Sequence, residues 1–201
     1  MGRFYLIRHG ETLWNTEARY QGHTDTSLNE KGLYQAKKLQ DRFIKEPFHE
    51  IFSSDLSRAA DTARIIAEPK NIPVHLTASL RELCFGQWEG FTYNEVILKY
   101  GDSINKWYNN PDRIMVPGGE PLLSMIKRIE DFIYSLATAQ PDNCFVIVTH
   151  GGPIRGIIAK INNIPLNEIW KIKIENGSIT TLETNNNAIR VIAINETSHL
   201  Y

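Results

Sequence analysis

The stretch FYLIRHGE, residues 4–11, contains four apolar residues followed directly by a cation, an imidazole and a glycine. A continuous apolar run that ends in polar residues and glycine predicts a short β-strand buried on both faces. A second stretch, FVIVTHGG at residues 145–152, has the same form. We therefore expect His9 and His150 to follow directly the carboxyl ends of two buried strands.

Three stretches between and around these strands have apolar residues at helical spacing: 30–43, 57–67 and 118–137. A further helix is expected after the second strand. We expect Asn29 to cap the first helix and Ser57 to cap the second. The apolar face of the first helix is expected to consist of Leu33, Ala36, Leu39 and Phe43.

Two other regions complete the predicted organisation. Residues 80–117 are aromatic-rich and broken by glycines, and they are expected to form an irregular, lid-like segment. Residues 169–195 predict three short strands, the first two joined by a two-residue hairpin at Asn176-Gly177. The alternation of strands and helices predicts one α/β domain over residues 1–201. Its expected architecture is a three-layer sandwich, with a mostly parallel central sheet, an antiparallel edge and helices on both faces.

Composition excludes several classes of function. The 201 residues are 42% hydrophobic and 22% charged, with a formal net charge of -1, which argues against broad binding to nucleic acid or to an anionic membrane. The two cysteines, Cys84 and Cys144, lie in unrelated contexts, so neither a disulfide framework nor a metal site is predicted. We expect a cytoplasmic protein without cofactor, export signal or membrane span; nothing in the chain indicates the oligomeric state.

The two histidines are expected at the sheet edge where open α/β folds bind ligands. Arg58 lies in the first turn of a helix that follows another strand, so it should reach the same edge, where free helix N–H groups favour an anion. Arg8 adds a second guanidinium. Each residue alone is more often structural, but together two guanidiniums and two imidazoles suit the oxygens of a phosphoryl group.

Four motifs, LIRHGET (6–12), SDLSRAADTA (54–63), RELCFGQWEG (81–90) and VTHGG (148–152), occur in this order. The chain from Phe4 to about Ile158 thereby resembles the histidine phosphatase superfamily, the phosphoglycerate-mutase-like proteins. The resemblance implies that His9 accepts the phosphoryl group, without a metal. It also implies contacts to the substrate from Arg8, Arg58, a cationic His150, Asn15, Gln21, Gly22 and Gly151.

The resemblance further implies that Glu82 is the acid that protonates the leaving alcohol. A carboxyl group can be protonated for the first step and ionised to activate water in the second. A neutral imidazole is a competent nucleophile once its other nitrogen is held as a donor. The chain departs from the family at Cys84, where relatives commonly carry Asp, and this change leaves the proposed catalytic set intact.

The expected partner is a small-molecule phosphomonoester. We expect hydrolysis rather than mutase activity, because residues 82–150 hold only five basic residues, the last two predicted as solvated: Lys99, Lys106, Arg113, Lys127 and Arg128. Six aromatic residues are candidates for a wall over the leaving group, although ordinary packing explains some of them: Phe85, Trp88, Phe91, Tyr93, Trp107 and Tyr108. Trp14 and Trp170 are expected to pack in the core, and His23 to lie at the mouth of the pocket.

Among branches of the family, the motifs look most like α-ribazole phosphatase, and an aromatic wall would suit a benzimidazole-like base. Three alternatives remain open. The chain could be a sugar-phosphate or broad-specificity phosphatase similar to fructose-2,6-bisphosphatase, a phosphoglycerate mutase, or a non-catalytic phosphate-binding protein.

Overall fold

A computed structural model describes residues 2–185 and 188–201 of the chain. Its centre is a six-stranded sheet with the order β3-β2-β4-β1-β5-β6. The strands are β1 (Gly2–Arg8), β2 (Glu50–Ser54), β3 (Val74–Thr77), β4 (Cys144–Thr149), β5 (Ile179–Asn185) and β6 (Ala188–Glu196). The first four strands, β1, β2, β3 and β4, all run parallel to one another, whereas β5 runs antiparallel to both of its neighbours. The predicted mostly parallel sheet with an antiparallel edge is confirmed.

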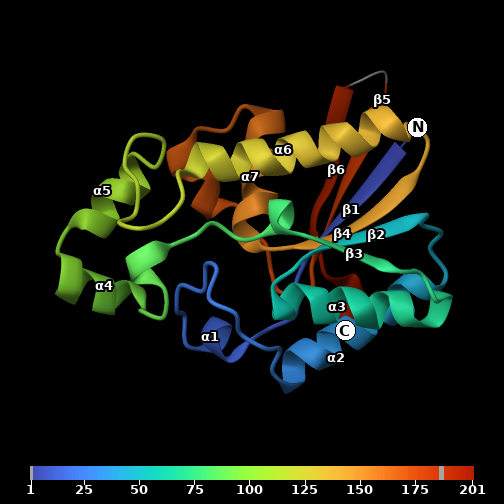
Figure 1. Ribbon diagram of the computed structural model, residues 1–201, viewed down its shortest axis with the longest axis horizontal. Coiled ribbons are helices and arrows are strands. Elements are labelled where there is room, and N and C mark those ends of the chain that lie inside the picture. The colour runs from blue at the N-terminus through green and yellow to red at the C-terminus, as the bar shows by residue number, and fades with distance from the viewer. Residues whose placement is uncertain (1, 186–187) are drawn as a thin grey trace.

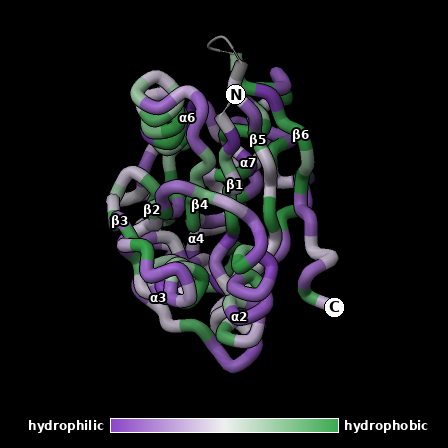
Figure 2. The backbone as a smooth tube through the Cα atoms, turned by 90° about the vertical axis from the view of Figure 1, so that its right-hand side faces the viewer, coloured by the Kyte–Doolittle hydropathy of each residue, from purple (hydrophilic) through white to green (hydrophobic). Residues whose placement is uncertain are grey.

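Helices cover both faces of this sheet. Figure 1 shows α2 (Glu30–Ile44) and α3 (Ser57–Ala67) below the strands, and α6 (Leu122–Ala139) and α7 (Gly151–Asn162) above them. The view along the other axis in Figure 2 shows the same separation of α6 from α2 and α3. The remaining helices are α1 (Leu13–Thr16), α4 (Tyr93–Tyr100), α5 (Ser103–Asn109) and the 3-10 turns Glu68–Lys70, Ala78–Leu80, Gly86–Trp88, Leu166–Lys171 and Ser198–Leu200.

The middle residues of the central strands, 4–7 of β1 and 145–148 of β4, are all apolar because both faces of the sheet are covered there. In β1, Phe4 and Leu6 pack under α6 and α7, whereas Tyr5 and Ile7 pack against α2 and α3. Side chains alternate between the faces of a strand, so two hydrophobic clusters form from one apolar run. This double burial explains why the strand lacks the polar alternation of a half-exposed sheet.

The register of the two central strands places the histidines side by side. β1 and β4 pair in parallel, with Arg8 opposite Thr149. The backbone of His9 continues the ladder by donating from its N–H to Thr149 O at 3.0 Å. Because His9 and His150 each come one residue after these partners, both leave the sheet at the same edge.

Two helix predictions need correction. Asn29 caps α2 as expected, since its side chain accepts from Gly32 N, but Leu33 is 47% exposed and lies outside the buried face. The apolar stripe of α2 begins one turn later. Helix α3 is capped by Leu56 rather than by Ser57, and the Ser57 hydroxyl instead donates to Asp25 at 2.6 Å. A local cap signal was overridden here by a partner from a distant loop.

The predicted hairpin at Asn176-Gly177 is wrong. The described residues of 169–195 contain two strands rather than three, β5 and β6, and residues 186–187 between them lie outside the described part of the chain. The Asn176-Gly177 pair instead folds against the end of β1: Gly177 N donates to Arg8 O at 3.0 Å, and Asn176 Nδ2 donates to His9 O at 3.1 Å. The carbonyls at the end of β1 thus outcompete a second strand for these donors.

The segment 80–117 is more ordered than expected, because it contains α4 and α5. These two helices form a lobe beyond the end of the sheet (Figure 1). A third hydrophobic cluster supports the lobe, and within it Trp88 and Trp107 meet edge to face with ring centroids 5.7 Å apart. Both tryptophans are buried, so they are core residues and not a wall facing the substrate.

No helix in the described parts of the chain is both long and apolar enough to span a bilayer.

Candidate active site

A cavity of about 420 Å³ opens at the edge of the sheet where β1 and β4 end. Seven predicted site residues line it: Arg8, His9, Asn15, Gln21, Gly22, Arg58 and Glu82. His150 lies against His9, with the two ring centroids 5.0 Å apart. Gly151 lies close to the same groups, because a Cβ at this position would be 2.6 Å from Arg155 Nη1 and 3.6 Å from Arg8 Nε. The structure therefore brings all nine predicted site residues together.

The His9 ring is held in one tautomer. Its Nδ1 lies 2.7 Å from the carbonyl oxygen of Gly10, and since a carbonyl only accepts, Nδ1 must carry the proton and donate it. Nε2 is consequently the unprotonated nitrogen of the neutral ring. Burial, followed by the charges of Arg58 and Arg8, lowers the pKa of His9 well below 6.5. His9 is thus a neutral imidazole with a free lone pair on Nε2.

The glycine after His9 is required by its surroundings. A Cβ on Gly10 would lie 2.5 Å from the carbonyl oxygen of Gly32 at the start of α2. The Gly10 N–H also donates to Thr62 Oγ1 of α3 at 3.1 Å. Because Gly10 O is the acceptor for the His9 ring, this close packing of the backbone against both helices fixes the orientation of the imidazole.

His150 is fully buried, and neither of its ring nitrogens has a hydrogen-bond partner among the described residues. Arg8 Nε and Arg58 Nε are buried without a partner in the same sense. Buried polar atoms are normally hydrogen-bonded, so four such nitrogens from three neighbouring residues indicate a ligand site. The two arginine Nε–H groups and the protonated nitrogen of His150 can donate there. The residue types favour an oxyanion.

The expectation that His150 is cationic is wrong for the chain on its own. Burial, then the positive charge of Arg58, lowers the pKa of His150 well below 6.5. The ring is therefore neutral in this environment. An anion beside the ring would act in the opposite direction and favour the charged form.

The two predicted arginines are held by main-chain carbonyls. Arg8 Nη1 donates to Ile174 O at 2.7 Å, whereas the Arg58 Nη groups donate to Thr24 O and Gly22 O at 2.9 and 2.7 Å. Burial lowers the pKa of each guanidinium to about 10, so both remain cationic at neutral pH. Arg58 is buried and Arg8 is half-buried, and because both are held by neutral acceptors their charge is available to an anion.

The polar loop after β1 offers amide donors to the same cavity. Asn15 Oδ1 accepts from Thr12 N and from Asn176 Nδ2, both at 3.1 Å. Gln21 Oε1 accepts from two threonine hydroxyls, Thr12 Oγ1 and Thr26 Oγ1. With both amide oxygens engaged in this way, the NH₂ groups of Asn15 and Gln21 are the parts that can donate to a ligand.

Glu82 approaches the pocket from the segment that follows β3. Its carboxylate accepts from the N–H of Gly152, at the start of α7, at 3.1 and 3.2 Å, and Oε1 also accepts from Leu83 N at 2.8 Å. A Cβ on Gly152 would overlap this carboxylate. Both glycines of the THGG motif therefore make room for side chains of the site, Gly151 for Arg155 and Gly152 for Glu82.

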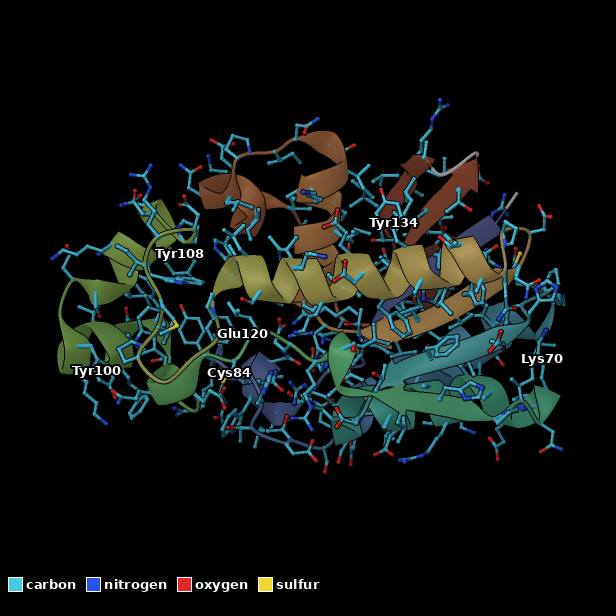
Figure 3. All side chains as sticks on the ribbon, turned by 45° about the horizontal axis from the view of Figure 1, so that its top comes forward. Lys70, Cys84, Tyr100, Tyr108, Glu120 and Tyr134 are labelled. Atoms are coloured by element: carbon cyan, nitrogen blue, oxygen red, sulfur yellow. The ribbon has the colours of Figure 1, made fainter. Side chains whose placement is uncertain are left out.

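Arg128 was predicted to be solvated, and this prediction is wrong. Its guanidinium donates to Ser79 O at 2.9 Å and to Glu82 O at 2.8 Å, and it pairs with Glu120 through Nε at 2.9 Å. Glu120 in turn joins the main chain of Cys84, since Glu120 N donates to Cys84 O at 3.0 Å. Figure 3 shows Cys84 and Glu120 close together between the α4–α5 lobe and α6. This network anchors the backbone that carries Glu82.

Sequence reasoning missed Arg155, which lines the cavity. Its Nε donates to Ile172 O at 2.8 Å, and its guanidinium lies 6.0 Å from the ring centre of Trp170. None of the described carboxylates forms an ion pair with it. The available signal was helical spacing, because Arg155 lies one turn after Gly151 on α7 and so projects from the same side of the helix.

The aromatic lining differs from the predicted wall. Of the six candidates only Phe85 and Tyr108 line the cavity, whereas Trp14 and Trp170, predicted as core residues, line it as well. Tyr20 completes the lining, and its hydroxyl meets that of Tyr108 on α5 at 2.8 Å (Figure 3 labels Tyr108). His23, expected at the mouth, instead places Nε2 2.9 Å from Glu82 O.

The chain belongs to the histidine phosphatase superfamily (branch 1), whose model matches residues 4–197. It is 32% identical over 200 residues to phosphoserine phosphatase 1 of Hydrogenobacter thermophilus, covering 100% of this chain and 95% of that one. It is also 32% identical over 181 residues to the adenosylcobalamin/alpha-ribazole phosphatase of Salmonella typhimurium, covering 90% of each. The solved structure of YhfR from Bacillus stearothermophilus superimposes with a TM-score of 0.94 at 29% identity over the whole of both chains. The chain is accordingly a phosphatase of this superfamily.

The low pKa values of His9 and His150 make stability depend on pH. Between their folded-state pKa and about 6.5 the unfolded chain binds more protons than the folded one, so stability falls as pH decreases below about 6.5. We expect about 1.4 kcal/mol of lost unfolding free energy per histidine for each pH unit in that window. Urea unfolding at pH 7, 6 and 5 measures the slope.

Millimolar orthophosphate should reduce this slope, since an anion between the guanidiniums favours the charged imidazoles. His150→Gln and His9→Gln should each remove part of the slope. The exposed control His75→Gln should leave it unchanged. A slope that is identical in the wild type and in both buried variants would contradict the assignment.

Proposed function

We propose that the protein hydrolyses phosphomonoesters through a phosphohistidine intermediate on His9. The observation that supports this most strongly is that the His9 Nε2 lone pair occurs in the same site as buried, unpartnered donors: Arg8 Nε, Arg58 Nε and the protonated nitrogen of His150. Nε2 supplies a nucleophile that is already deprotonated. The surrounding donors supply the electrostatic stabilisation on which phosphoryl transfer depends.

In the first step, His9 Nε2 attacks phosphorus, a P–N bond forms and the ester P–O bond breaks. The leaving oxygen takes its proton from the carboxyl group of Glu82. In the second step, Glu82 removes a proton from water, the water oxygen attacks phosphorus and the P–N bond breaks to release inorganic phosphate. The chain's own side chains carry every proton and every bond change in this scheme.

Hydrolysis is favoured over phosphoryl return to the same substrate. Mutase activity needs further cations to grip both a substrate carboxylate and a second phosphate, and the basic residues between Glu82 and His150 are where the sequence would supply them. None of those five residues is among the described residues that line the cavity. In Arg128, the most buried of them, Nε, Nη1 and Nη2 already donate to Glu120 and to main-chain carbonyls.

For the substrate we propose α-ribazole 5'-phosphate. Five aromatic side chains face the cavity, which suits a flat apolar base on the leaving alcohol: Trp14, Tyr20, Phe85, Tyr108 and Trp170. The relative in Salmonella typhimurium carries this activity in its name.

A second candidate, phosphoserine, is supported by Arg155. Four arginines line the cavity, and one of them, Arg19, is already paired with Glu17 and Glu95. With Glu82 protonated for the first step, three guanidiniums remain, whereas a phosphate dianion neutralises only two. An additional carboxylate on the substrate would balance the third. The relative in Hydrogenobacter thermophilus is a phosphoserine phosphatase by name.

A panel of phosphomonoesters separates these candidates. We expect kcat/KM for α-ribazole 5'-phosphate to exceed that for phosphoserine, fructose 2,6-bisphosphate and p-nitrophenyl phosphate by at least about tenfold, the value of roughly 1.4 kcal/mol of selective contact. Arg155→Met should change kcat/KM for α-ribazole 5'-phosphate little. A preference for phosphoserine that Arg155→Met selectively removes would instead establish the second candidate, and a flat profile would contradict both.

A further inference from the structure

The orientation of Arg58 depends on a three-residue loop. The Nη groups of Arg58 donate to the carbonyls of Gly22 and Thr24, and the side chain is completely buried. Gly22 itself has a left-handed backbone, with φ of 55°. Displacement of residues 22–24 would therefore move the acceptors that aim the guanidinium into the cavity.

The carboxylate of Glu89 holds this loop in place. One oxygen, Oε2, accepts from Thr24 N at 2.9 Å and from Thr24 Oγ1 at 2.6 Å. The other, Oε1, accepts from His23 N at 3.0 Å and from Phe85 N at 3.0 Å. Glu89 thus ties the loop that aims Arg58 to the segment that carries Glu82 and Phe85.

The junction between the Glu89 carboxylate, residues 22–24 and Phe85 is tightly packed. A Cβ on Gly22 would overlap the Glu89 carboxylate, so glycine is needed there for space as well as for its positive φ. Cys84 also points its thiol at this carboxylate, with Sγ 3.6 Å from Oε1. The carboxylate is therefore enclosed by groups that donate to it.

We propose that Glu89 is a positioning residue for phosphoryl binding, acting through the 22–24 loop on Arg58. The proposal rests on the proposed role of Arg58 in the hydrolase. Glu89 does not touch the phosphoryl group in this scheme. Its effect is to fix the carbonyls of Gly22 and Thr24, and misplacement of a binding group by about 1 Å can cost roughly two decades in rate.

A carboxylate suits this junction better than a carboxamide. Three backbone N–H groups and one hydroxyl converge on two oxygens, and an N–H cannot turn to become an acceptor. In Glu89→Gln, either orientation of the amide directs its NH₂ toward at least one of these backbone donors. The loop must shift to relieve the contact.

Glu89→Gln in a double-mutant cycle with Arg58→Ala provides the test, with inhibition by orthovanadate and kcat/KM for p-nitrophenyl phosphate as readouts. When Arg58 is intact, we expect Glu89→Gln to raise the orthovanadate Ki and to lower kcat/KM, each by roughly ten- to hundredfold. In the Arg58→Ala background the same change should cost less than about threefold, because the group on which it acts is gone.

Three controls keep the result interpretable. Thr24→Val removes one hydroxyl donor to Glu89 and should reproduce a smaller loss that likewise depends on Arg58. Glu46→Gln alters a carboxylate that accepts from Tyr5 and Arg42 away from the site, and it should leave Ki and kcat/KM unchanged. Thermal unfolding of each variant measures stability separately.

The outcomes divide clearly. Equal losses in both backgrounds would overturn the proposal, since Glu89 would then act independently of Arg58, and so would full orthovanadate affinity in Glu89→Gln. If Arg58→Ala alone left orthovanadate affinity intact, the failure would lie with the proposed role of Arg58 in the hydrolase. A loss of orthovanadate affinity and of kcat/KM that occurs only when Arg58 is intact, with thermal unfolding unchanged, would support the proposal.

Discussion

His9→Ala will reduce kcat for any phosphomonoester by roughly four orders of magnitude or more, the scale on which removal of a covalent nucleophile acts. The reason is geometric: Nε2 of His9 is the free nitrogen of a ring whose other nitrogen is bound to Gly10 O at 2.7 Å. Wild-type protein mixed with 32P-labelled substrate and quenched in alkali should retain label on the chain. His9→Ala should retain none.

His150→Ala supplies the matched comparison for this experiment. It removes a ring 5.0 Å from His9 that offers one N–H donor in its neutral form but lacks the fixed tautomer. We expect a loss of about two to three decades in kcat, as for a preorganised electrostatic donor, while the protein still becomes labelled. Label on His9→Ala, or loss of label only in His150→Ala, would transfer the role of nucleophile to His150.

Glu82→Gln should distinguish leaving groups. For an alkyl phosphate we expect kcat to fall by about 10²- to 10⁴-fold, because the alkoxide leaves without its proton. For p-nitrophenyl phosphate the first step should change far less, since the phenolate is stable unprotonated. Breakdown of the phosphohistidine should then limit turnover, because water has lost its base.

A rapid-mixing experiment therefore predicts a burst of about one p-nitrophenol per site in Glu82→Gln. Glu183→Gln, which alters an ion pair with Arg3 away from the cavity, should show wild-type kinetics. If Glu82→Gln slowed both substrates equally and gave no burst, Glu82 would be a positioning residue rather than the acid and base.

The parts of the site that could be predicted are those that local sequence and parallel pairing control together. His9 and His150 follow short apolar runs bounded by polar residues and glycine, which predict buried strands, and parallel strands end at one edge of the sheet. Arg58 follows β2 in the first turn of α3, so it reaches that edge by the same rule. Four motifs in order then identified the family, and the match of the family model to residues 4–197 confirms it.

The parts that could not be predicted depend on contacts between distant segments. Arg155 and Trp170 enter the cavity because α7 and the turn Leu166–Lys171 pack together; helical spacing from Gly151 could place Arg155 on the correct side of α7, but Trp170 has no local signal. Arg128 reads as a solvated helix residue until Glu120 and the carbonyl of Glu82 are placed beside it. The Asn176-Gly177 pair satisfies a hairpin rule, yet it binds the end of β1 instead.

By itself the sequence determined the α/β architecture, the family and the atoms capable of phosphoryl chemistry, because hydrophobic periodicity and residue type are local properties. Only the tertiary structure decided which His9 nitrogen is free, that His150 is neutral, and how Arg58 and Glu82 are held. Those features depend on burial, on acceptors such as Gly10 O and Thr24 O, and on donors such as Gly152 N. Desolvation and hydrogen-bond direction exist only once distant segments meet, so they cannot be read from residue order.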